Sequence, residues 1–405
     1  MKIHIQKARL LDPSTQQDGI GDLFIADDKI VAYHAAPDSF TADKTINAHH
    51  HWVMPGLIDI SLNASAPSTL IAATELAALS GVTSVCCAPS TDPVLDAPAV
   101  AVSILPSTLS TRLFPIGALT QGLAGKQLAP MAALKRAGCV ALSNARSPIS
   151  DTATLRHAFD YAATMDLPII YHPLDPYLSQ GDVHEGQASL RLGLPGIPAS
   201  AETIDLARAL LLQQETGVRL HIARLSTAAS VAMIANAKAQ GYAVTADVAI
   251  HHLYLTENDV LGFASNCHVQ PPLRTLLDQQ ALIQGVKEGV IDIICTDHYM
   301  LTAADKSAPF AQTKPGIAGL GSLLPLALGL VQRNNVPLLQ VLAALSYNAA
   351  RLINKPLGTL AVGSAADIIM VDPEGNCSVA LDGTCNPFAS WPLQGELVGC
   401  FVAGR

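Results

Sequence analysis

The chain has 405 residues, half of them apolar, a length that favours one large domain accompanied by a smaller one. Its formal net charge is −9 and its lysines and arginines form no cluster, so nucleic-acid binding is not expected, because phosphate contacts require grouped positive charge. No uncharged run of about 18–20 residues suggests a membrane span, and the first 13 residues lack the long apolar run of a signal peptide. The eight scattered cysteines are typical of a reduced cytoplasmic protein.

Both ends of the chain read as short strands separated by turns. β-forming residues cluster at 3–5, 23–25, 30–33, 366–371 and 397–402. Asp-Pro pairs at 12–13 and 372–373 supply turns. Because the two ends share this character and differ from the middle, we expect residues 1–52 and 356–405 to pair into one small β-domain.

The middle of the chain alternates apolar strand candidates with amphipathic helical segments, which indicates an α/β fold. The expected strands cover residues 53–59, 82–88, 113–119, 139–143, 168–172, 218–225, 243–248 and 291–296. Helical periodicity is clear at residues 69–79, 202–213 and 279–288. Eight strands with intervening helices over residues 53–355 fit a (β/α)8 TIM-type barrel. A doubly wound sheet gives a similar alternation, so periodicity alone leaves both folds open.

Three polar residues stand at the ends of expected strands, where barrel enzymes build their sites. His172 ends the fifth strand, His221 lies in the sixth, and Asp297 ends the eighth. Each alone has an ordinary explanation as a hydrogen-bonded core histidine or a helix-capping aspartate. Together they would converge on one barrel mouth, which makes them the candidate site.

Ordered motifs along the chain carry a family resemblance. They read MPGLID at 54–59, GVTS at 81–84, PSTDP at 89–93, HIARLST at 221–227, VTAD at 244–247, QPPLR at 270–274, TDH at 296–298, PGIAGL at 315–320 and NAARL at 348–352. In this order they resemble the long, two-domain dihydroorotases of the amidohydrolase superfamily. The resemblance implies a barrel flanked by a split β-domain.

The resemblance also implies a chemistry. Members of this family use one or two zinc ions to make a hydroxide that attacks a cyclic amide, since bound metal lowers the pKa of water to about 7. Carried over to this chain, His172 and His221 would be metal ligands, and Asp297 a ligand and proton shuttle. Arg274 and Gln270, in the QPPLR motif, would bind substrate if the protein is active.

Several family positions are replaced by neutral residues. Ser61 and Asn63 stand where the family has a pair of ligand histidines, and Asn144 stands where it has the bridging carboxylate. Ser65 replaces the arginine that clamps the substrate carboxylate, and Ser90 replaces an asparagine. Hydroxyl and amide groups are poor zinc ligands beside imidazole, so we expect no binuclear centre.

The favoured interpretation is a dihydroorotase-like protein without catalysis, which would carry no cofactor or at most a single zinc ion. By family resemblance it would be a structural partner of aspartate carbamoyltransferase, the preceding enzyme of pyrimidine synthesis, and an oligomer. The alternative is an active zinc-dependent dihydroorotase, or a hydrolase of a related cyclic amide, with a rearranged mononuclear site. His184 and Glu185, on the loop after the fifth strand, could supply a substitute ligand.

Overall fold

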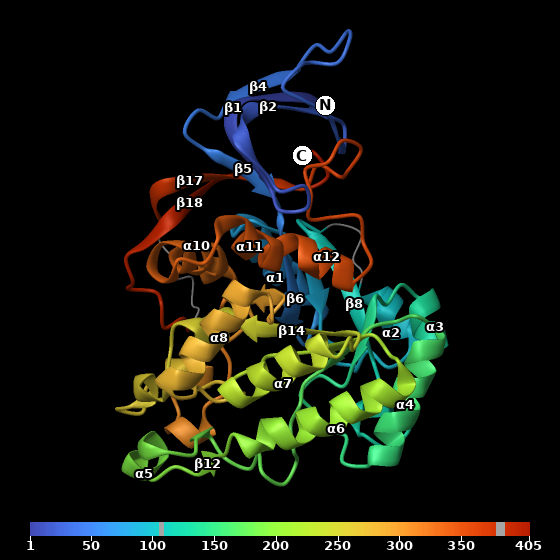
Figure 1. Ribbon diagram of the computed structural model, residues 1–405, viewed down its shortest axis with the longest axis vertical. Coiled ribbons are helices and arrows are strands. Elements are labelled where there is room, and N and C mark those ends of the chain that lie inside the picture. The colour runs from blue at the N-terminus through green and yellow to red at the C-terminus, as the bar shows by residue number, and fades with distance from the viewer. Residues whose placement is uncertain (105–108, 378–384) are drawn as a thin grey trace.

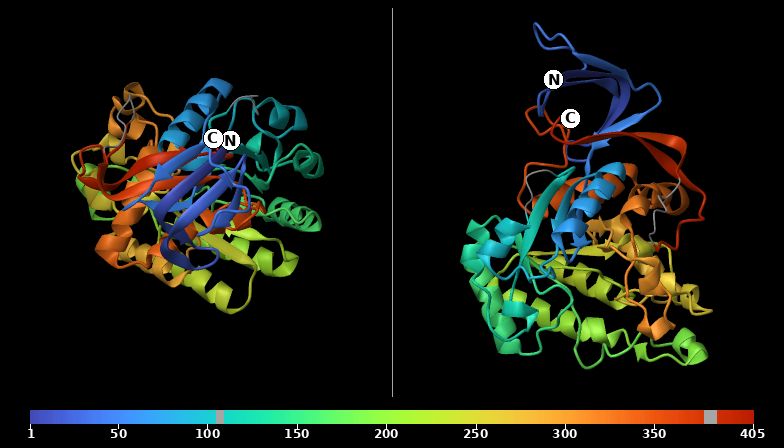
Figure 2. Two further views of the ribbon diagram at one scale, coloured as in Figure 1. Left: turned by 90° about the horizontal axis from the view of Figure 1, so that it is seen from above. Right: turned by 180° about the vertical axis from the view of Figure 1, so that it is seen from behind.

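A computed structural model describes residues 1–104, 109–377 and 385–405. It shows a β-sheet built from both ends of the chain, stacked on a larger body of parallel strands and helices (Figure 1). Views from above and behind show the two chain ends lying near each other beside the small sheet (Figure 2). The expected fold class, an α/β barrel with a composite terminal β-domain, is confirmed.

The terminal sheet is mixed and has the order β18-β17-β5-β1-β2-β3, with β4 pairing with β1. Its strands are β1 (Lys2–Asp12), β2 (Gln17–Ala26), β3 (Lys29–Tyr33), β4 (Lys44–Asn47), β5 (Trp52–Pro55), β17 (Ile368–Cys377) and β18 (Leu393–Phe401). β5 joins the two ends of the chain, because it pairs with β1 on one side and with β17 on the other. The predicted domain boundary between residues 52 and 53 therefore falls inside a strand of this sheet.

The parallel sheet has the order β15-β14-β13-β10-β9-β8-β7-β6-β16. Its strands are β6 (Leu57–Asn63), β7 (Val82–Cys87), β8 (Arg112–Ala118), β9 (Ala141–Ser143), β10 (Ile169–Tyr171), β13 (Leu220–Ile222), β14 (Val244–Ala249), β15 (Ile293–Cys295) and β16 (His298–Tyr299). β16 follows β15 in the chain and pairs with β6. The eighth strand of the barrel thus returns to the first, with Thr296 and Asp297 at the junction.

Helices follow most barrel strands and cover the outside of the sheet (Figure 1). They are α1 (Pro67–Leu79), α2 (Pro98–Ser103), α3 (Met131–Arg136), α4 (Thr152–Thr164), α5 (Gln187–Leu192), α6 (Ser200–Thr216), α7 (Ala228–Ala239), α8 (Leu276–Glu288), α9 (Ala303–Lys306), α10 (Leu323–Asn334), α11 (Leu338–Leu342) and α12 (Asn348–Leu352). Two short strands, β11 (Val183–His184) and β12 (Gly196–Ile197), pair in the long connection after β10. Among the described helices, none is long and apolar enough to cross a bilayer.

Three clusters of buried apolar residues hold these layers together. The largest lies between the barrel strands and their helices, and a second lies among strand residues such as Ile58, Ile116 and Ile170, together with α12. The third fills the terminal sheet and combines Ile3 with Ile368 from the other end of the chain. Each cluster excludes water from apolar surface, which is the main favourable term in folding.

Candidate functional site

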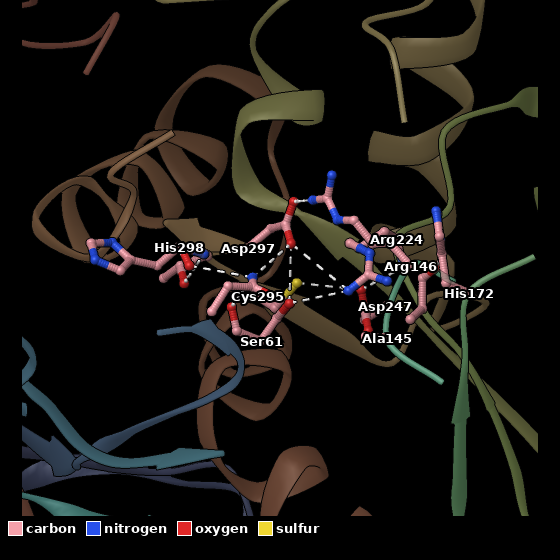
Figure 3. A network of polar contacts seen from close by, with 12 residues as sticks. Ser61, Ala145, Arg146, His172, Arg224, Asp247, Cys295, Asp297 and His298 are labelled. Carbon is pink, nitrogen blue, oxygen red and sulfur yellow. Dashed lines mark hydrogen bonds and ion pairs between the residues drawn. The ribbon is translucent and has the colours of Figure 1, made fainter. Parts of the chain in front are cut away.

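Asp297 lies at the centre of a polar network where the eighth strand meets the first (Figure 3). Its side chain is 1% exposed. Arg146 Nη2 donates to one carboxylate oxygen, Oδ2, of Asp297. Arg224 Nη1 lies 3.8 Å from the other oxygen, Oδ1, which also accepts hydrogen bonds from Ser61 Oγ at 3.2 Å and Asn63 Nδ2 at 3.4 Å. Both oxygens of the carboxylate are therefore engaged by side chains of the protein.

The two arginines determine the charge of Asp297. Burial alone would raise the pKa of this carboxyl, but the positive charges of Arg146 and Arg224 outweigh burial and hold the pKa below its usual range. Burial disfavours the charged Arg146 in the same way, yet the charge of Asp297 keeps the pKa of Arg146 raised. The three groups thus stabilise one another as ions inside the barrel.

Asn144, at the position of the bridging carboxylate, shapes the turn that carries Arg146. Its Oδ1 accepts a hydrogen bond from Thr120 Oγ1 at 2.7 Å, and its Nδ2 donates to the carbonyl oxygen of Ser147 at 2.8 Å. A carboxylate at this position could accept the first bond but could not donate the second. The guanidinium of Arg146 also lies 5.0 Å from the centre of the Tyr299 ring, a cation–π contact that fixes it further.

Local backbone strain marks the same site. The backbone φ angles of Ala145, Arg224 and Asp297 are 52°, 58° and 49°. They lie in the left-handed region, which residues other than glycine seldom adopt. Such conformations persist where the surrounding structure enforces them, and they concentrate at functional sites. At Arg224 and Asp297 the strained backbone belongs to the residues that form the ionic network.

His221 does not join Asp297, in contrast to the sequence expectation. Its Nε2 lies 2.9 Å from Asp247 Oδ2, and its Nδ1 lies 2.8 Å from Thr245 Oγ1. Both ring nitrogens are therefore held by β14, the neighbouring strand. The side chain that reaches Asp297 from the same segment is Arg224.

His172 remains at the site without a strong partner. Its Nδ1 lies 3.3 Å from the carbonyl oxygen of Ala223, and its buried Nε2 has no hydrogen-bond partner in the described part of the chain. Burial, followed by the charges of Arg224 and Arg146, lowers its pKa well below the usual value, so the ring is neutral. Figure 3 shows it beside the two arginines.

The residues present do not fit a metal ion. Within the described residues, no group of three or more histidine, cysteine, aspartate or glutamate side chains is placed to hold one. Two permanent positive charges contact the only carboxylate of the predicted set, and a cation there would be repelled by both. The set of His172, His221 and Asp297 is therefore not assembled as metal ligands.

Arg274, a predicted substrate-binding residue, ties down a segment of chain. Its Nη1 donates to the carbonyl oxygen of Ile197 at 2.6 Å and lies 2.9 Å from His184 Nδ1, while its Nε donates to Ser226 Oγ at 3.1 Å. The guanidinium thus holds the β11–β12 region against the barrel. Gln270 is half-buried and precedes a cis peptide bond.

Two buried ionisable residues escaped the sequence analysis. Asp59 accepts hydrogen bonds from Thr296 N and Oγ1 at 2.8 and 2.6 Å, and burial raises its pKa to about 6. His251 is fully buried, burial lowers its pKa to about 4, and neither ring nitrogen has a partner among the described residues. Asp59 ends the MPGLID motif, and His251 lies four residues after the VTAD motif. Arg224 lies inside the HIARLST motif and Arg146 lies two residues after Asn144, but the family pattern gave neither arginine a role.

Comparison with known proteins places this geometry in a family. Residues 44–405 match the family model described as the amidohydrolase family. The chain is 43% identical to a dihydroorotase-like protein of Pseudomonas aeruginosa, covering 100% of this chain and 99% of that one. It is 44% identical to a dihydroorotase-like protein of Pseudomonas putida over 93% of this chain and 91% of that one. It is also 39% identical to a dihydroorotase of Pelotomaculum thermopropionicum, with 100% and 98% covered.

A solved structure supports the fold. The L-hydantoinase (dihydropyrimidinase) of Arthrobacter aurescens superposes with a TM-score of 0.89 at 22% identity, covering 100% of this chain and 95% of that one. At this identity the likeness bears on the fold alone. The family match and the full-length relatives carry the assignment: the chain belongs to the amidohydrolase family, within its dihydroorotase-like proteins.

Proposed function

We propose that this protein is a dihydroorotase-like member without dihydroorotase activity, and that it is a cytoplasmic structural partner of aspartate carbamoyltransferase. The observation that carries the first part is the ionic network of Arg146, Arg224 and Asp297. A general base works best when its pKa lies near the operating pH. Asp297 is held as a carboxylate by two arginines, so it is a weak proton acceptor.

The ligand positions support the same conclusion. A catalytic zinc site needs about three protein ligands and one open position. Ser61 and Asn63 donate hydrogen bonds to Asp297, Asn144 holds a turn, and His221 pairs with Asp247. Each therefore has a structural role that replaces metal binding. We propose that the protein uses no cofactor.

Metal content and turnover test this proposal together. The purified chain, incubated with zinc and then desalted, is analysed for bound metal and assayed for carbamoyl-aspartate cyclisation and dihydroorotate hydrolysis. We expect far less than one zinc per chain and no turnover above that of the Asp297→Ala variant. Stoichiometric zinc with turnover that Asp297→Ala abolishes would overturn the proposal and favour the mononuclear alternative.

The partner role rests on the family resemblance and requires its own test. The chain is mixed with aspartate carbamoyltransferase from the same organism, and the mixture is studied by analytical ultracentrifugation. We expect a defined complex that also forms with Asp297→Ala, because a scaffold depends on its surface and not on the barrel mouth. Two separately sedimenting species at micromolar concentrations would contradict the partner role.

A further inference from the structure

A cavity of about 320 Å³ lies at the mouth of the barrel, beside the ionic network. Its walls include Asn63, Ser65, Ser90, Arg146, Tyr299 and Lys314. Among the described residues that line it, two are cationic and none is an aspartate or glutamate. This volume lies at the lower end of the range of about 300–1,000 Å³ that small-molecule sites occupy, so the cavity suits a small ligand.

Arg146 lines this cavity with a guanidinium that the protein uses only in part. Its Nη2 donates to Asp297 and its Nε is buried without a partner, whereas Nη1, which has no acceptor within residues 1–104, 109–377 and 385–405, is the donor left for a ligand. The contact with Tyr299 and the bond to Asp297 hold the guanidinium in place before any ligand arrives. A fixed, planar guanidinium is the preferred protein partner of a carboxylate.

The charge around Arg146 also favours an anion. Arg146 and Arg224 share one carboxylate, Asp297, so these three groups carry one excess positive charge. The nearby buried Asp59 and Asp247 bond to Thr296 and His221 and do not line the cavity. An anion bound to Arg146 would therefore meet no carboxylate in the described cavity wall.

The other lining residues indicate what kind of anion fits. Lys314 is 71% exposed and pairs with Asp305 at 2.7 Å, so it contributes little to binding at the rim. Met300 and Leu301 line the cavity with apolar surface, which can pack against the carbon skeleton of a ligand. An organic acid satisfies both the charged and the apolar walls, whereas an inorganic anion satisfies only the first.

We propose that this cavity binds a small organic carboxylate, with the carboxylate group on Arg146, and that the bound molecule is held without being converted. This inference rests on the proposal above that no metal occupies the mouth. The ligand is not converted, because Asp297 cannot serve as a base while it is paired with both arginines. It would therefore act as an effector or stabiliser of the protein.

Calorimetric titration with succinate tests the inference. The full chain is first treated with o-phenanthroline, which contains no carboxylate, and the chelator is removed, so that any metal is absent. Wild type, Arg146→Gln and Arg136→Gln are titrated at low ionic strength, with inorganic phosphate in a parallel series. Arg136 is exposed on α3 and lies outside the cavity, so it serves as the matched control.

We expect saturable binding of one succinate per chain to wild type and Arg136→Gln. Arg146→Gln should bind at least about tenfold more weakly, since hydrogen bonds to charged groups dominate such recognition, and phosphate should bind more weakly than succinate. No saturable binding, equal binding by Arg146→Gln, or tighter binding of phosphate would each overturn the inference. The zinc and turnover assays report on the proposed function separately.

Discussion

Replacing Arg146 by methionine should destabilise the protein far more than the same change at an exposed ion pair. The Asp297 carboxylate, 1% exposed, would keep only Arg224 at 3.8 Å and the neutral donors Ser61 and Asn63. Breaking one side of a buried ion pair costs about 3–5 kcal/mol. Because Arg224 remains as a second cation, we expect a loss near the lower end, about 3 kcal/mol.

The control is Arg9→Met. Arg9 pairs with Asp18 at 2.7 Å, but the two side chains are 40% and 38% exposed, and pairs of this kind contribute about 0–1 kcal/mol. The free energy of unfolding is measured from urea denaturation followed by circular dichroism at neutral pH. Adding Asp297→Asn to Arg146→Met should recover at least half of the loss, because it removes the uncompensated charge.

The pH dependence of the free energy of unfolding tests the same role of Arg146 independently. In the wild type the pKa of Asp297 is lowered, so its stabilising contribution is present above the ordinary carboxyl pKa and is lost as pH falls through the lowered value. Without Arg146 that pKa rises, and protonation relieves the buried charge. The deficit of Arg146→Met should therefore shrink on acidification. A loss equal to that of Arg9→Met, or no recovery with Asp297→Asn, would refute the counter-charge role of Arg146.

Three further predictions concern residues around the site. The pKa of Asp59 rises from 3.8 to about 6 in the folded state, so the folded state binds its proton more tightly and stability should fall as pH rises through this window. Asp59→Asn should remove that fall when thermal unfolding is measured at stepped pH. The same dependence of stability on pH in Asp59→Asn and wild type would contradict this prediction. The pKa of His251 drops from 6.5 to about 4, so stability should be lost as pH falls between these values, and His251→Gln should flatten this acid loss in the same assay. Arg274→Met should release residues 184–198 and speed proteolytic cleavage there by about tenfold or more, since at least one buried charged hydrogen bond is lost; cleavage at the wild-type rate would argue against the anchoring role.

Apolar periodicity predicted most of the fold, because strands buried on both faces must be apolar throughout. One expected strand, residues 53–59, is in fact two, β5 and β6, that belong to different sheets. The division falls at Gly56, where a Cβ atom would lie only 2.2 Å from Thr83 Oγ1. This close approach lets the chain pass from one sheet to the other, and no periodicity in the sequence reveals it.

The candidate site was less predictable than the fold. Motif positions named Asp297, Ser61 and Asn63, which contact one another in the structure, but they could not show which side chain of the HIARLST segment reaches Asp297. That choice depends on Asp247, from the neighbouring strand, which holds His221. Arg146 and Asp297 are 151 residues apart in the sequence, and only the folded barrel brings them together as an ion pair.

The composite sheet constrains the order in which the protein can be completed during translation. Ile3, Ile5 and Leu23 emerge from the ribosome early, yet part of the apolar surface that covers them, including Ile368 and Met370, is made long afterwards. Until then the nascent N-terminal strands present an uncovered apolar face and an open edge at β5, features that invite aggregation. Chaperones should therefore be needed most while the barrel is being synthesised, and a nonsense codon before β17 should yield an insoluble product.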